Sequence, residues 1–134
     1  MPEEVRKEVL LGKKSRGKAN IQSAIDAGWL KIWNKPVTPL KGIDLDEGET
    51  ACICLALDSL EPALLIIDER AGRTVAKEND IKIIGTAAII GLAKQKGYIL
   101  SARDAFEKLH QSDFRISADV IRTVLIRVGE MSPI

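Results

Sequence analysis

The chain has 134 residues, of which 46% are hydrophobic and 29% charged, so it can bury a core and does not resemble a disordered polymer. Its formal net charge of +1 excludes a general electrostatic attraction to nucleic acid, so such binding would have to come from a local patch. No apolar stretch approaches the roughly 18 residues of a membrane span. Because the first residues are also too charged for a secretory signal, we expect a cytoplasmic protein.

The first third of the chain is predicted to be mostly helical. Val5 and Val9 lie one helical turn apart behind acids that suit a helix N-terminus, and the alternation around Trp29 and Trp33 is typical of a strand with both tryptophans on one side. The predicted elements are a helix over 2–11, a basic glycine-containing loop over 12–18, a helix over 19–28 closed by Gly28, a strand over 29–33 and a loop containing Pro36, Pro39 and Gly42.

The rest of the chain alternates helices with two short apolar strands. The predicted elements are a helix over 46–59, a strand over 63–68, a helix over 70–80, a strand over 81–84, and helices over 85–97, 101–110 and 117–129. We expect Thr86, Ser101 and Ser117 to cap the last three helices, with Asp104 completing a capping box. Gly97 and Gly129 are expected to end two of them, and Val120, Val124 and Val128 to form one apolar stripe.

Apolar strands without alternation are typical of a parallel sheet that is covered on both faces. The pattern therefore predicts an α/β fold with helices on both sides of a parallel sheet, in a single domain over 1–134. Ligands in such folds bind at the carboxyl ends of the strands, and Asp68 stands at the end of the strand over 63–68.

The cysteines and the histidine are better explained by structure than by chemistry. Cys52 and Cys54 are interpreted as small buried hydrophobes in a reducing compartment, since two cysteines without histidine neighbours make a poor zinc site. His110, the only histidine, lies near a predicted helix end and is interpreted as a helix-terminal residue rather than a catalyst.

Three acids from separate elements each have two interpretations. Asp68 either caps the helix that begins near Arg70 or is a functional carboxylate at the end of a strand. Glu49 suits a first helical turn, and Glu8 suits a solvated helix surface, but both could join Asp68 at one end of the sheet. Clustered carboxylates repel one another, and bound Mg²⁺ or Mn²⁺ relieves that repulsion and can stabilise a phosphodiester transition state.

The chain resembles a prokaryotic family related to the PIN-domain nucleases. The resemblance spans nearly the whole chain and is most specific in "LDEGETACICLAL" and "LLIIDERAGRTVAKENDIKIIGT", followed by "GLAKQKGYI". It implies a PIN-like three-layer α/β/α sandwich with a parallel sheet and an acidic cluster that binds Mg²⁺ or Mn²⁺ and cleaves RNA, as in the toxin ribonucleases of toxin–antitoxin pairs. By this resemblance Glu8, Glu49 and Asp68 are the catalytic and metal-binding acids, with Glu69 as a neighbouring metal ligand.

One departure from the family pattern concerns the first strand. PIN domains normally begin with a strand that carries the first Asp, in a pattern like "DTSxLI", whereas this chain starts at the following element. By this resemblance it is expected to be either an N-terminally truncated PIN domain or a reduced variant of one. The resemblance therefore leaves one metal ligand missing and a strand edge unpaired. An unpaired edge with uncovered apolar surface invites formation of a homodimer.

Two main hypotheses follow from these residues, beside a plainer third one in which the chain is a structural remnant without an active site. In the first, the chain is a metal-dependent endoribonuclease whose RNA backbone contacts come from the basic residues Lys13, Lys14, Arg16, Lys18, Arg70 and Arg73. In the second, it is a catalytically impaired PIN-like module that binds RNA, a second copy or an antitoxin protein. The basic loop has a plain alternative as a solvated run of charge, and Arg73 as a structural partner of Asp68 or Glu69.

Overall fold

The computed structural model describes residues 1–11, 17–33 and 45–133. The chain divides into two compact units, Met1–Ile83 and Ile84–Ile134, and each is described by itself. The described part is an α/β structure that is mostly helical, with a small two-stranded parallel sheet. None of the described helices is long and apolar enough to cross a bilayer. The three-layer arrangement and the single domain over 1–134 stay predictions.

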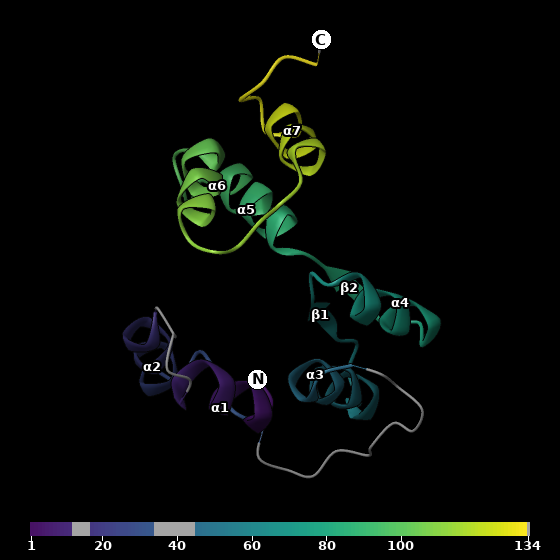
Figure 1. Cartoon of the computed structure of the whole chain (residues 1–134). Coiled ribbons are helices and arrows are strands. Elements are labelled where there is room, and N and C mark those ends of the chain that lie inside the picture. The colour runs from purple at the N-terminus through teal and green to yellow at the C-terminus, as the bar shows by residue number, and fades with distance from the viewer. Residues whose placement is uncertain (12–16, 34–44, 134) are drawn as a thin grey trace. The chain divides into compact units, whose positions relative to one another are not determined.

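The described residues of the first unit form four helices and the sheet (Figure 1). Its elements are α1 (Glu3–Leu11), α2 (Lys18–Asp26), α3 (Glu47–Asp58), β1 (Leu64–Ile66), α4 (Arg70–Glu78) and β2 (Lys82–Ile84), whose last residue opens the second unit. The crossover from β1 through α4 to its neighbour β2 is the usual way to join parallel strands. The helices predicted over 2–11, 19–28, 46–59 and 70–80 are thus confirmed, with small shifts at their ends.

The core of the first unit lies on one face of β1. Leu65 and Ile67 are buried there against Ile53 of α3 and Ala76 of α4. Leu64 and Ile66 alternate with them and remain 60% exposed. The prediction that this strand is covered on both faces is therefore wrong for this unit, because α3 and α4 both contact the Leu65 face. An apolar run does not by itself reveal whether a second layer covers it.

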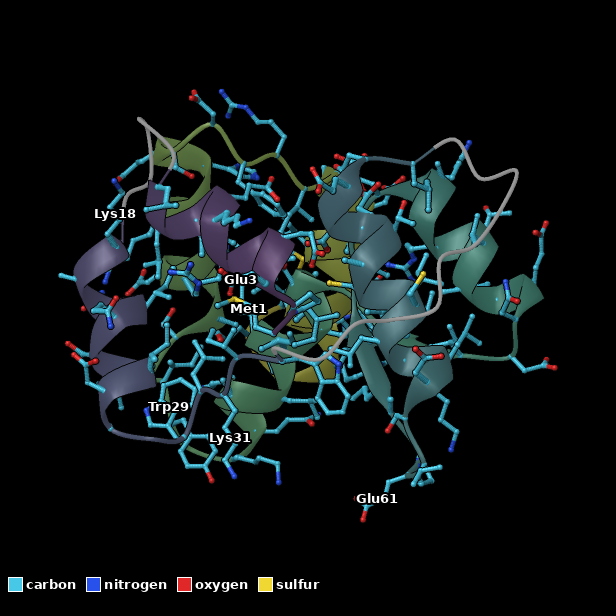
Figure 2. All side chains as sticks on the ribbon, turned by 90° about the horizontal axis from the view of Figure 1, so that it is seen from below. Met1, Glu3, Lys18, Trp29, Lys31 and Glu61 are labelled. Carbon is cyan, nitrogen blue, oxygen red and sulfur yellow. The ribbon has the colours of Figure 1, made fainter. Side chains whose placement is uncertain are left out.

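The segment over 29–33 does not form the strand that its alternation predicts. Its described residues form one isolated parallel β-bridge, between Trp33 and Pro2. The Trp33 amide donates to the Met1 carbonyl at 2.8 Å, and the Met1 ammonium donates to the Lys31 carbonyl at 2.8 Å (Figure 2). Pro2 has no amide hydrogen to extend the ladder, so the pairing ends there. Trp29 remains 76% exposed.

Beyond Ile84, the regular elements of the second unit among the described residues are all helices. Its helices are α5 (Thr86–Gln95), α6 (Ala102–Gln111) and α7 (Ala118–Arg127). The predicted caps of α6 and α7 are confirmed, since Ser101 accepts from the Asp104 amide and Ser117 from the Val120 amide. The cap of α5 is Gly85, so the prediction of Thr86 was one residue late. Thr86 already has helical backbone, and a threonine just inside a helix looks like a cap in sequence.

The core of the second unit forms between the three helices. Ala87, Ala102, Phe106 and Leu125 are buried, and Val124 and Val128 pack against them. Val120 is 44% exposed, so only part of the predicted valine stripe faces this core. Not every apolar side chain of the nearly all-apolar helix α5 is buried either, since Leu92 is 44% exposed.

Candidate functional site

The start of α3 is fixed by a reciprocal cap. Asp46 is the N-cap residue, and its Oδ1 accepts a hydrogen bond from the Glu49 amide at 2.7 Å. A backbone hydrogen bond from Asp46 to the Glu49 carboxyl completes the box. The interpretation of Glu49 as an acid of a first helical turn is therefore correct as far as it goes. The cap also holds the Glu49 side chain in one place, half-buried at the end of the helix.

Glu49 has a second neighbour that its capping role does not explain. Partial burial raises the pKa of Glu49, and repulsion from Asp46 and from Glu69 raises it further. A side-chain hydrogen bond with Glu69 acts in the same direction. The two carboxyl groups therefore lie close together, and their proximity disfavours the charged form of Glu49.

Glu69 reaches this position because of where α4 begins. It is the N-cap residue of α4, in extended conformation, and makes no side-chain cap hydrogen bond among the described residues. The alternative that Asp68 caps this helix was wrong by one residue. Asp68 immediately precedes the cap and is exposed. Two successive carboxylates, Asp68 and Glu69, therefore follow the buried residue Ile67, which comes directly after β1.

Glu8 approaches the same end of α3 from α1. Its Oε2 lies 2.8 Å from the point where a side chain on Gly48 would place its Cβ. A pocket of about 450 Å³ opens between the two helices. The lining of this pocket is mostly charged and consists of Glu4, Lys7, Glu8, Leu11, Asp46, Glu47 and Gly48.

We call Glu8, Glu49, Asp68 and Glu69 the acidic edge. The contacts described above involve Glu8, Glu49 and Glu69, and Asp68 is included because it directly precedes Glu69 in the chain. The structure brings Glu49 and Glu69 together. Glu8 of α1 lies against Gly48, the residue that precedes Glu49 in α3. Within the described ranges, no three acidic, histidine or cysteine side chains come close enough to hold a metal ion. The donor chemistry nevertheless suits Mg²⁺ or Mn²⁺, which need only one or two carboxylates when water and phosphate oxygens complete the shell.

The predicted basic residues fall into three groups. Lys13, Lys14 and Arg16 lie outside the described residues. Lys18 opens α2 and is exposed (Figure 2). Arg70 and Arg73 lie in the first turn of α4, directly after Glu69, where Arg70 is exposed and Arg73 half-buried. Two guanidinium groups thus follow the acidic edge along the chain.

Two glycines of the site were missed by sequence reasoning. Gly48 and Gly72 are both buried inside helices, and a Cβ at Gly72 would meet Ile67 Cδ1 and lie 3.6 Å from Glu49 Oε1. The signal that could have found them is their position, since each stands in the first turn of a helix next to charged residues. A glycine there costs helix stability, which hints that space is needed.

The cysteines and the histidine have no part in the acidic edge. Cys54 is buried and Cys52 half-buried, and burial raises the pKa of the Cys52 thiol, which opposes formation of a reactive thiolate. His110 is in the last turn of α6, in the second unit, as predicted.

Fold and site together define an α/β protein with carboxylates gathered where a strand ends and two helices begin. A family model described as PIN domain matches residues 1–130. The chain therefore belongs to the PIN-domain family, and the predicted resemblance is confirmed. A search of curated proteins and a search of solved structures found no match to the chain.

Proposed function

We propose that the chain is a PIN-type, metal-dependent endoribonuclease whose chemistry takes place at the acidic edge. The observation that carries the proposal is the closeness of the Glu49 and Glu69 carboxyl groups, which helps to raise the pKa of Glu49. Two carboxyl groups from separate elements are held against each other at a cost in repulsion, and such an arrangement is typical of functional sites rather than of structural ones.

In this proposal Glu49 and Asp68 hold the cation, with help from Glu8 and Glu69. Bound Mg²⁺ or Mn²⁺ would supply an acidified water and charge stabilisation for hydrolysis of an RNA phosphodiester. The raised pKa of Glu49 opposes the charged form that would bind the cation, so binding should weaken as the pH falls. Arg70 and Arg73, with the basic residues of 12–18, hold the backbone phosphates.

The family resemblance also supports a biological setting. As a toxin component, the chain would act on RNA in the cytoplasm and be held inactive by an antitoxin protein. The exposed apolar residues Leu64 and Ile66 of β1 are consistent with a homodimer or with such a partner, since surface of this kind is normally covered.

A second candidate function is a PIN-like module that binds nucleic acid or protein without cleaving RNA. The observation in its favour is that no three side chains of the described acidic edge come within metal-binding distance. A site with only two close carboxylates would bind a divalent cation weakly and orient water poorly.

The deciding experiment is calorimetric titration of the chain with Mn²⁺, followed by cleavage assays on structured RNA. We expect Glu49→Gln and Asp68→Asn to weaken Mn²⁺ binding by about tenfold or more and to abolish cleavage. Glu61→Gln is the matched control, because Glu61 is an exposed acid in the segment before β1 (Figure 2). RNA binding without Mn²⁺ binding or cleavage would favour the binding module. Equal Mn²⁺ affinity in all variants would contradict the proposed site.

A further inference from the structure

We propose that Gly48 is a positioning residue of the acidic edge: its missing side chain leaves the space in which the Glu8 carboxylate lies against the first turn of α3. This inference rests on the proposed function for its consequence, but not for its geometry. It assigns a role to a residue that neither holds a cation nor touches RNA.

The space at Gly48 is narrow and is filled by a carboxylate. A Cβ there would lie 2.8 Å from Glu8 Oε2, closer than such atoms approach in proteins, and 3.5 Å from Val5 Cγ2. The other neighbour is Asp46 Oδ1, at 3.6 Å. Only the Glu8 contact is too short. An alanine at this position would therefore displace the Glu8 carboxylate and leave its other neighbours in ordinary contact.

The backbone does not demand a glycine at this position. Gly48 lies within α3 and does not have a positive φ. The described glycines that do are Gly17, Gly28, Gly97 and Gly129. Alanine would be the better helix former by up to about 1 kcal/mol. A glycine that is neither conformationally required nor favourable for the helix is best explained by the space that it leaves for Glu8.

The geometry of α3 explains why this space matters for the edge. Consecutive residues of a helix point about 100° apart, so positions 48 and 49 face different neighbours. Gly48 faces Glu8 of α1, whereas Glu49 faces Glu69 and the Gly72 region of α4. One turn of α3 thus brings carboxylates of three elements to one end of the unit. Gly48 sets how closely the α1 carboxylate approaches.

Gly72 supplies a matched control for this role. It is also a buried glycine in the first turn of a helix, but the side chain that a Cβ would crowd is apolar: it would meet Ile67 Cδ1 and lie 3.3 Å from Ile67 Cγ1. Glu49 Oε1 lies at 3.6 Å, an ordinary contact distance. Gly72→Ala therefore brings the same gain in helix propensity as Gly48→Ala, and it moves a methyl group rather than a carboxylate.

The first readout needs no metal. We expect Gly48→Ala to shift the side-chain carboxyl ¹³C resonance of Glu8, measured by NMR on the metal-free chain, whereas Gly72→Ala leaves it unchanged. Because Glu8 Oε2 is the free end of a flexible side chain, the melting temperature should stay level or rise. An unchanged Glu8 resonance in Gly48→Ala would overturn the inference, whatever the metal titrations show.

The second readout connects the geometry to the proposed site. We expect Gly48→Ala to weaken Mn²⁺ binding about as much as Glu8→Gln does, on the order of tenfold, with no further loss when the two are combined. Wild-type Mn²⁺ affinity in Gly48→Ala would overturn the positioning role. A shifted Glu8 resonance in a chain that binds no Mn²⁺ even as wild type would instead contradict the proposed function and leave the geometry standing.

Discussion

The N-termini of α3 and α6 each receive a glutamate, and the two glutamates behave in opposite ways. At α6, Glu130 comes from the segment after α7 and accepts hydrogen bonds from the Ala102 amide at 2.6 Å, the Ser101 hydroxyl at 3.1 Å and the Arg103 amide at 3.2 Å. Partial burial would raise the pKa of Glu130, but these hydrogen bonds together outweigh it and lower the pKa.

At α3 the balance is reversed. One backbone hydrogen bond lowers the pKa of Glu49, but burial and the nearby Asp46 and Glu69 carboxylates outweigh it. A helix N-terminus favours an anion, so the raised pKa of Glu49 means that burial and the neighbouring carboxylates oppose that preference. The difference teaches that hydrogen bonds can favour the charged form of a carboxyl at one helix start, as at Glu130, while burial and like charges disfavour it at another, as at Glu49.

The largest predicted effect tests whether the two units that carry Glu49 and Glu130 unfold in a single transition. Ile53 is fully buried in the first unit and Leu125 nearly so in the second. We expect Ile53→Ala and Leu125→Ala each to lower the free energy of unfolding by about 3 kcal/mol, because each leaves a cavity. If the predicted single domain holds, urea unfolding followed by circular dichroism and by tryptophan fluorescence will give one coincident transition in both variants. Both tryptophans lie in the first unit, so fluorescence reports on that unit.

The matched control is Leu60→Ala, which removes a fully exposed leucine and should change stability by less than about 0.5 kcal/mol. Separate transitions by the two probes would contradict the single-domain prediction and show that the units fold independently.

The next effect in size concerns Glu130. We expect Glu130→Ala to destabilise the chain by about 1–2 kcal/mol, since it removes one charged acceptor from three donors at a solvent-accessible helix end. The folded-state pKa is lowered, so this stability is present above the ordinary value of 4.5 and is lost as the pH falls through the folded pKa. Urea unfolding between neutral and acid pH measures both effects.

Glu107→Ala is the control, because Glu107 is an exposed acid on α6 itself. Equal losses in the two variants would mean that Glu130 contributes only general surface charge, and the contrast with Glu49 would lose its structural basis.

Local signals predicted the elements well. Ser101 and Ser117 cap their helices because a serine, an amide three residues on and a following apolar run lie within one turn of chain. The strand predicted over 29–33 failed because a strand needs a partner strand, and sequence alternation does not reveal that the described part of this segment pairs through one isolated bridge between Trp33 and Pro2. The exposure of Leu64 and Ile66 was likewise decided by where two distant helices pack.

The candidate site shows the same division. Its acids were identifiable by type and by position at element ends, but the pairing of Glu49 with Glu69 joins residues twenty positions apart through packing of α3 on α4. The space at Gly48 depends on contact between α1 and α3. Such approaches follow from tertiary packing, to which a single sequence gives no direct access.

The smallest predicted effect tests Glu49 directly and has the opposite sign to that at Glu130. Glu49→Gln keeps the shape of the side chain and removes its charge, so it should stabilise the metal-free chain at neutral pH by about 0.5–1 kcal/mol. Because the folded-state pKa of Glu49 is raised, its favourable contribution is present below the ordinary value of 4.5 and is lost as the pH rises through the folded pKa. The advantage of the glutamine should therefore grow over that rise.

Urea unfolding of wild type, Glu49→Gln and Glu69→Gln across this range measures the effect, and Glu61→Gln provides the control at an exposed position. Removal of either partner's charge relieves the same repulsion, so the double variant Glu49→Gln with Glu69→Gln should gain less than the sum of the two. Additive gains would show that the carboxylates do not interact. A loss of stability in Glu49→Gln would mean that the hydrogen bond between Glu49 and Asp46 outweighs the repulsion. Glu49 would then stabilise the fold through its hydrogen bonds, as Glu130 is expected to do.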